Sequence, residues 1–191
     1  PAGFAVVGSN VFFAANDGIA GIELWKSDGT SAGTVLVKDI YSGSFGSSPS
    51  GLVNVGGTLF FSAFDTANGT ELWKSDGPAA GTVLVKDIYP GISSSFPSAL
   101  VNVGGTLFFT AADAANGREL WKSDGTAAGT VLVADIDPGS SSSSPSNLAG
   151  VGATLFFTAV DANTGRELWK SDGTAAGTLL VKDINAGAPS G

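Results

Sequence analysis

The chain alternates short apolar runs with turns rich in glycine, serine and asparagine, and this pattern predicts an all-β protein. A first run at residues 52–55 ends in Gly56 and Gly57, and a second run follows at once at 58–61. A Gly-Gly pair between apolar runs fits a two-residue hairpin, whose residues need positive φ. The second run is apolar throughout, as expected of a strand covered on both faces. No segment shows a helical period.

The third apolar run is the motif Glu-Leu-Trp-Lys-Ser-Asp-Gly, which occurs four times. The fourth run, for example at residues 34–40 and 82–88, follows a second Gly-Thr pair, and a longer Gly/Ser/Pro segment closes each repeat. The motif returns every 48 residues, as its tryptophans show: Trp25, Trp73, Trp121 and Trp169. A fixed period of this length indicates a repeat architecture.

Four strands joined by three short turns, followed by a longer connection, fit one blade of a β-propeller. The fold class predicted is therefore a β-propeller of four 48-residue, four-stranded blades per chain, in a single array at about 1–48, 49–96, 97–144 and 145–191. The ring could close with eight blades by dimerisation, or with four in one chain. The repeats start with an inner strand and end with an outer one, so no spare strand latches the ring. We favour the homodimer, with a longer head-to-tail array as a further alternative.

The ends of the chain carry two further expectations. The last closing segment, at 185–191, is shortened, so we expect the chain to stop where a fifth blade would begin. There is no methionine, so Pro1 either follows a cleavage or belongs to an excerpt of a longer protein.

The extended motif Glu-Leu-Trp-Lys-Ser-Asp-Gly-Thr-x-Ala-Gly-Thr, at 119–130 and 167–178, resembles the ELWxxDGT repeats of bacterial, often secreted, multi-repeat proteins. Pro78 replaces the expected threonine in the second copy. The resemblance covers essentially the whole chain. It implies a β-propeller-type array, usually without an assigned activity, in a secreted or cell-surface bacterial protein.

A weaker resemblance is to the quinoprotein-type propeller repeat, A-x-D-x-x-T-G-x-x-x-W. The fourth repeat matches it fully, at Ala159, Asp161, Thr164, Gly165 and Trp169. The third repeat has Asn116 in place of the threonine and otherwise matches at Ala111, Asp113, Gly117 and Trp121. In that family the tryptophan docks between neighbouring blades, and we carry over only this role. No residues for a quinone cofactor are identified.

Composition narrows the function classes. The formal net charge of −8 argues against nucleic acid or an anionic membrane as partner. The chain has no histidine and no cysteine, which removes Ser-His and Cys-His nucleophiles and thiolate metal sites. No run has the length of a membrane span, so we expect no membrane insertion.

The repeated tryptophans have two interpretations. An aromatic face could stack on a sugar, and a glycan ligand would follow. We favour a structural role in blade docking for Trp25, Trp73, Trp121 and Trp169, because every repeat keeps the residue.

The polar loops before the motif place hard oxygen ligands close together, so calcium is the one cofactor considered. The alternative is an Asx turn, in which the Asp or Asn side chain caps its own backbone. The candidate calcium ligands are Asp65, Asn68 and Glu71, then Asp113, Asn116 and Glu119, then Asp161, Asn163 and Glu167.

The Asp-Gly turns at Asp28, Asp76, Asp124 and Asp172 could supply a carboxylate pair for glycoside cleavage. Four equivalent copies speak against this, because an active site needs a few differentiated residues in one cleft. We therefore expect no catalytic residues and no enzyme. The predicted function is a non-catalytic scaffold or protein- and surface-interaction module. The alternative is one ligand site per blade, for a carbohydrate or for calcium.

Overall fold

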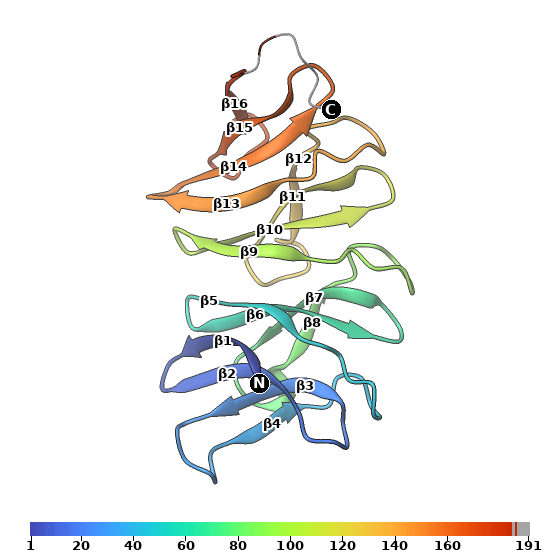
Figure 1. The fold of residues 1–191 in the computed structure, drawn as a ribbon, viewed down its shortest axis with the longest axis vertical. Helices are drawn as coiled ribbons and strands as arrows, with labels where there is room; N and C mark the ends of the chain where they lie inside the picture. Colours follow the sequence, from blue (N-terminus) through green and yellow to red (C-terminus); the bar gives the residue numbers. More distant parts are fainter. Residues whose placement is uncertain (185, 187–191) are drawn as a thin grey trace. The chain divides into compact units, whose positions relative to one another are not determined.

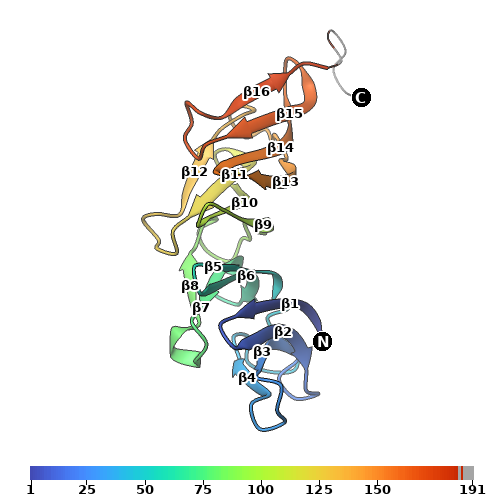
Figure 2. The same ribbon diagram turned by 90° about the vertical axis from the view of Figure 1, so that its left-hand side faces the viewer.

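The computed structural model describes residues 1–184 and 186, and it contains four antiparallel four-stranded sheets (Figure 1). Within each sheet the strands lie side by side in chain order, as the turned view also shows (Figure 2). We call the sheets blades 1 to 4. The chain divides into two compact units, Pro1–Pro97 with blades 1 and 2, and Ser98–Gly191 with blades 3 and 4. The all-β prediction and the four strands of each blade are confirmed, and the single array stays a prediction.

The first unit has eight strands. Blade 1 comprises β1 (Ala2–Val7), β2 (Asn10–Asn16), β3 (Ile22–Ser27) and β4 (Val35–Lys38). Blade 2 comprises β5 (Ser50–Val55), β6 (Thr58–Asp65), β7 (Gly69–Ser75) and β8 (Val83–Lys86), with a one-turn 3-10 helix η1 (Ala79–Gly81) between β7 and β8.

The second unit repeats the pattern without the helix. Blade 3 comprises β9 (Ser98–Val103), β10 (Thr106–Asp113), β11 (Gly117–Ser123) and β12 (Val131–Ala134). Blade 4 comprises β13 (Ser146–Val151), β14 (Thr154–Asp161), β15 (Gly165–Ser171) and β16 (Leu179–Lys182). No helix among the described residues has the length and apolar character of a membrane span.

Three details differ from expectation or fall outside it. The fourth strand of blade 2 ends at Lys86, two residues before the end of the apolar run, because the N–H groups of Ile88 and Tyr89 donate to the Glu71 carboxylate. The helix η1 follows Pro78, and one turn is too short to show a helical period. The closing segment predicted at 185–191 lies outside the described residues, apart from Ala186.

Each unit has an apolar core between the facing sides of its two blades. In the first unit one face of blade 1 packs against one face of blade 2. Blade 1 contributes Phe12, Leu24 and Val37, and blade 2 contributes Leu59, Phe61, Ala63 and Trp73. In the second unit blade 3 meets blade 4 in the same way, through Val103, Phe108, Leu120, Val133, Ile136, Leu155, Phe157 and Ala159. The periodic apolar positions are thus used twice, with the same residue types at the same places in the repeat.

The innermost strand of every blade carries a bulge. Its register against the second strand shifts at one place, for example between Ser50 and Val53. The bulged residue has a left-handed backbone, which glycine adopts without steric cost. Blades 1 and 2 have glycine there, Gly3 and Gly51, whereas blade 3 has Ala99 with φ of 52°. Alanine at this position strains the backbone, because its Cβ approaches the following carbonyl oxygen.

We expect Ala99→Gly to raise the free energy of unfolding by about 1 kcal/mol, because the substitution removes the Cβ that strains the left-handed backbone. Urea denaturation followed by circular dichroism measures the change. The matched control is Gly51→Ala, at the equivalent place in blade 2, which should lower stability by a similar amount. A destabilising Ala99→Gly would contradict the strain.

Candidate functional site

The Ser-Asp-Gly-Thr turn of the motif is a closed hydrogen-bond network, seen clearly in blade 3. The Asp124 carboxylate accepts from the Thr126 N–H at 2.8 Å and from its hydroxyl at 2.7 Å. The Ser123 hydroxyl accepts from the Gly125 N–H at 2.9 Å and lies 2.7 Å from the Thr130 hydroxyl, which donates to the Thr126 carbonyl. Ser123 is therefore the donor to Thr130. The polar atoms of the turn hold one another.

The same network recurs in blades 1 and 4, and its second glycine has a specific role. A Cβ on Gly129 would lie 2.1 Å from the Asp124 carboxyl group, so only glycine fits beneath the carboxylate. A Cβ on the equivalent glycines would also lie too close to the carboxyl group of the aspartate in the same turn. The distance would be 2.0 Å for Gly33 and Gly177 and 1.6 Å for Gly81. In blade 2 Pro78 removes the threonine hydroxyl from the turn.

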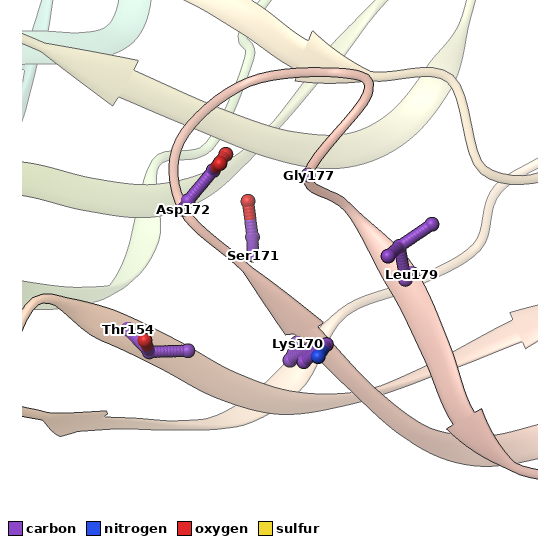
Figure 3. Close-up of a pocket in the computed structure, with 6 residues that line it drawn as sticks. All are labelled: Thr154, Lys170, Ser171, Asp172, Gly177 and Leu179. Atoms are coloured by element: carbon purple, nitrogen blue, oxygen red, sulfur yellow. The ribbon is translucent and has the colours of Figure 1, made fainter.

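Small hollows lie beside this turn in the second unit. In blade 4 a hollow of about 220 Å³ is lined by Thr154, Lys170, Ser171, Asp172, Gly177 and Leu179. Figure 3 shows Ser171 and Asp172 pointing into the loop that joins β15 to β16, with Lys170 and Thr154 on the strands below. In blade 3 a hollow of about 310 Å³ is lined by Thr106, Lys122, Ser123, Asp124, Ala128, Gly129 and Val131. Both are at or below the small end of the range for ligand pockets, roughly 300–1,000 Å³.

The motif glutamates form a second network, away from the hollows. In blade 2 Glu71 is fully buried and accepts from the Ser95 N–H at 2.8 Å and from the Ser95 hydroxyl at 2.6 Å. It also accepts from the Ile88 N–H at 3.1 Å. Its carboxylate thus ties the long closing connection of the blade to the third strand. We call this arrangement the glutamate latch.

The latch repeats in the other blades. Glu23 accepts from the N–H of Ser47 at 2.8 Å and from that of Tyr41 at 3.0 Å. Glu119 accepts from the N–H and hydroxyl of Ser143, and Glu167 accepts from the Ile184 N–H at 3.1 Å. The serine lies 24 residues after the glutamate in the first three repeats. That constant spacing was the signal in the sequence, and the composition of the Ser-rich connections concealed it.

The predicted calcium ligands occupy two different networks. Asp65 accepts from the N–H groups of Ala67 and Asn68, at 2.7 and 2.8 Å, and from the Asn68 side-chain amide. This is an Asx turn, whereas the third proposed ligand, Glu71, holds the closing connection.

The other two sets behave alike. Asp113 accepts from the N–H groups of Ala115 and Asn116, and Asp161 from those of Asn163 and Thr164. Glu119 and Glu167 belong to latches. Among the described residues no group of three or more Asp or Glu side chains is placed to hold a metal ion. Calcium binding stays a prediction.

Two of the four motif tryptophans lie at the interface between the two blades of a unit. Trp73 belongs to the core cluster shared by blades 1 and 2, and Trp169 packs against the cluster shared by blades 3 and 4. Lys38 of blade 1 places its Nζ 5.8 Å from the Trp73 ring centroid and donates at 2.8 Å to the Thr82 carbonyl of blade 2. Trp121 is buried, and Trp25 is half-buried.

Burial makes one latch carboxyl group, that of Glu119, a weaker acid than usual. Desolvation raises the pKa of Glu119 from 4.5 to about 7, and hydrogen bonds from Ser143 and Ile136 offset part of this shift. The pKa of Glu71 is raised for the same reason. Hydrogen bonds from Thr30 lower the pKa of the exposed Asp28 carboxyl group.

Comparison with known protein families and with curated proteins finds no match. Among solved structures, a puromycin hydrolase aligns with a TM-score of 0.60 and 14% identity, over 94% of this chain and 29% of that chain. A prolyl endopeptidase aligns with a TM-score of 0.58 and 16% identity, over 91% and 24% of the two chains. The Bacteroides ovatus xyloglucan PUL protein GH43B aligns with a TM-score of only 0.43 and 17% identity, over 89% and 38% of the two chains.

The prolyl endopeptidase has a β-propeller-type fold. At such low identity the likeness shows the fold alone. The chain spans 24–29% of the length of the two better-aligned structures. The four sheets therefore have the form of propeller blades, and the activities of those proteins do not transfer to this chain.

We expect Gly129→Ala to lower the free energy of unfolding by about 1–3 kcal/mol, because the new Cβ displaces the Asp124 carboxylate and breaks its hydrogen bonds. Urea denaturation measures the loss. In a double-mutant cycle the cost of Gly129→Ala should largely vanish in an Asp124→Ala background. Additive costs would contradict displacement of the carboxylate.

Stability should fall as pH rises from 5 to 8. Glu119 has a higher pKa in the folded chain than in the unfolded one, so its contribution is fully present below pH 4.5 and is lost as pH rises through about 7. No histidine titrates in this window. Thermal melts at pH 5 to 8 measure the slope, and Glu119→Gln should flatten it, although the variant itself is less stable. An equal slope in both proteins would assign the pH dependence to other groups.

Proposed function

We propose that this chain is a non-catalytic repeat module that serves as a structural scaffold or interaction domain. The observation that carries the proposal is the internal use of the motif. Its glutamate holds the closing connection, its tryptophan packs between two blades in blades 2 and 4, and its serine and aspartate close a turn. Side chains already committed to one another are poor candidates for chemistry on a substrate.

The proposal extends to the assembly and its setting. We place the four blades in a propeller ring, closed by two chains with eight blades or by one chain with four. The resemblance of the motif to the ELWxxDGT repeats supports a secreted or cell-surface bacterial protein. The net charge of −8 supports partners other than nucleic acid.

A catalytic role for the turn aspartates is not part of the proposal. Asp28, Asp124 and Asp172 each accept from the N–H and hydroxyl of the threonine two residues later. Each lies in its own blade, with an equivalent environment. A glycosidase needs two carboxylates that differ in role and face one bond.

A second candidate function is ligand binding once per blade, and the hollows beside the turn favour it. The hollow in blade 4 combines an exposed lysine, two hydroxyl groups and a carboxylate, which are groups that bind sugar hydroxyls. The Asx turns at Asp65, Asp113 and Asp161 are the corresponding candidates for calcium.

Melting curves in calcium and in chelator, together with a glycan array, test the two functions. A ligand present at a hundredfold excess over its Kd would stabilise the folded chain by about 2.7 kcal/mol. The scaffold predicts coincident melts and a blank array. A calcium-dependent rise in Tm that Asp113→Ala reduces, or a glycan signal that Lys170→Ala removes, would replace the scaffold with the ligand-binding function.

A further inference from the structure

The connection that closes blade 1, at residues 41–47, differs from its copies in carrying two aromatic side chains, Tyr41 and Phe45. The residues equivalent to Phe45 in the next two repeats are Ser93 and Ser141. Because two copies fold the same connection with serine at this place, the fold itself does not require phenylalanine. The aromatic residue therefore points to a role beyond the folding of the repeat.

Three aromatic rings follow one another from blade 2 to this connection. The Phe64 ring, on β6, packs edge-on against the Tyr41 ring, with 5.2 Å between centroids and 60° between planes. The Tyr41 ring stacks with the Phe45 ring, at 6.1 Å and 12°. We call these three residues the aromatic platform. Phe64 and Tyr41 are half-buried, whereas Phe45 is 79% exposed.

The exposure of Phe45 is a property of the first unit. All three rings belong to the unit Pro1–Pro97, and in that unit by itself Phe45 is at least as exposed as in the whole chain. One face of its ring lies toward Tyr41. The other face is open to solvent within the unit.

The glutamate latch fixes the connection at both ends. Glu23 accepts from the Tyr41 N–H at 3.0 Å and from the Ser47 N–H at 2.8 Å, and Phe45 lies between these two bonds in the sequence. The Ser47 carbonyl accepts from the Phe64 N–H at 2.9 Å, which joins the connection to blade 2. The platform is thus ordered before a ligand arrives, which reduces the entropy lost on binding.

We propose that the aromatic platform binds a neutral polysaccharide of β-linked pyranose units, with one sugar ring stacked on the open face of Phe45. The inference rests on the second candidate function, glycan binding, and replaces one site in each blade with a single site on blade 1. The C–H groups of such a sugar form an apolar face that packs on an aromatic ring. The net charge of −8 disfavours an anionic polysaccharide, so the ligand is neutral.

The neighbours of Phe45 favour a sugar over an apolar peptide. The residues before it on the connection are Ser42, Gly43 and Ser44, and all three are exposed. A serine hydroxyl both donates and accepts hydrogen bonds, as a sugar hydroxyl does. A pyranose needs one flat apolar face with hydrogen-bonding groups beside it, and the connection supplies this combination.

The first test is affinity electrophoresis of the full chain in native gels that contain a neutral β-glucan, β-mannan or β-galactan. At least one of these polysaccharides should retard the chain. Phe45→Ser should raise the dissociation constant at least about tenfold, because it removes the stacking face. The variant should fold, since Ser93 and Ser141 occupy the equivalent places. The matched control is Ile92→Ser, because Ile92 is 83% exposed on the equivalent connection of blade 2 and should leave the retardation unchanged.

The second test separates ring stacking from a general apolar contact. Phe45→Leu keeps an apolar side chain but has no flat face, so it should lose the retardation as Phe45→Ser does. Phe45→Trp presents a larger aromatic face and should keep or strengthen the retardation. The Trp variant also adds a fluorophore whose emission should shift when the polysaccharide is added.

Retardation that survives Phe45→Leu would indicate a general apolar contact, such as a peptide makes, and would overturn the proposal. Retardation that survives Phe45→Ser but is lost in Lys170→Ala would place glycan binding at the hollow of blade 4, so the second candidate function would stand and this site would not. A wild-type chain that none of the three polysaccharides retards would remove both and leave the scaffold function intact. The failures are therefore distinguishable.

Discussion

The fold depends on one buried interaction, the glutamate latch. A propeller blade can form its sheet from local hairpins, but the chain must then leave the fourth strand and begin the next blade. The Glu71 carboxylate controls this step by accepting N–H groups both just after the fourth strand and just before the next blade, at Ile88 and Ser95. A buried carboxylate without these donors would cost free energy, so the closing connection is held against the third strand.

The second constraint is repetition itself. The motif glutamate accepts a hydrogen bond from the segment just after the fourth strand in every blade, and the turn network recurs in blades 1, 3 and 4. Pro78 removes a hydroxyl from one turn, and a 3-10 helix appears there. Ala134 replaces the lysine found at Lys38, Lys86 and Lys182. Such a pattern suits a scaffold, because a catalytic centre requires one place that differs from its copies.

Much of the fold could be predicted from the sequence, because a 48-residue period with four apolar runs leaves few alternatives to a propeller blade. The Asp-Gly turns could be predicted equally well, since the conformation of a turn depends on residues that are adjacent in the sequence. The role of Glu71 was not, because it depends on Ser95, 24 residues away, and a carboxylate beside an Asx loop suggests a metal on spacing alone. The strained Ala99 was hidden for a similar reason, since alanine gives no sign of a left-handed backbone.

The latch also defines what a single copy of the repeat contains. Glu23 and Ser47 belong to the same 48-residue frame, as do Glu71 and Ser95, and Glu119 and Ser143. A segment cut at the prolines that precede each inner strand carries both ends of its own latch. Gene duplication or loss in steps of 48 residues therefore transfers a complete hydrogen-bonded cassette. Arrays of different length can arise in this way without a redesigned junction.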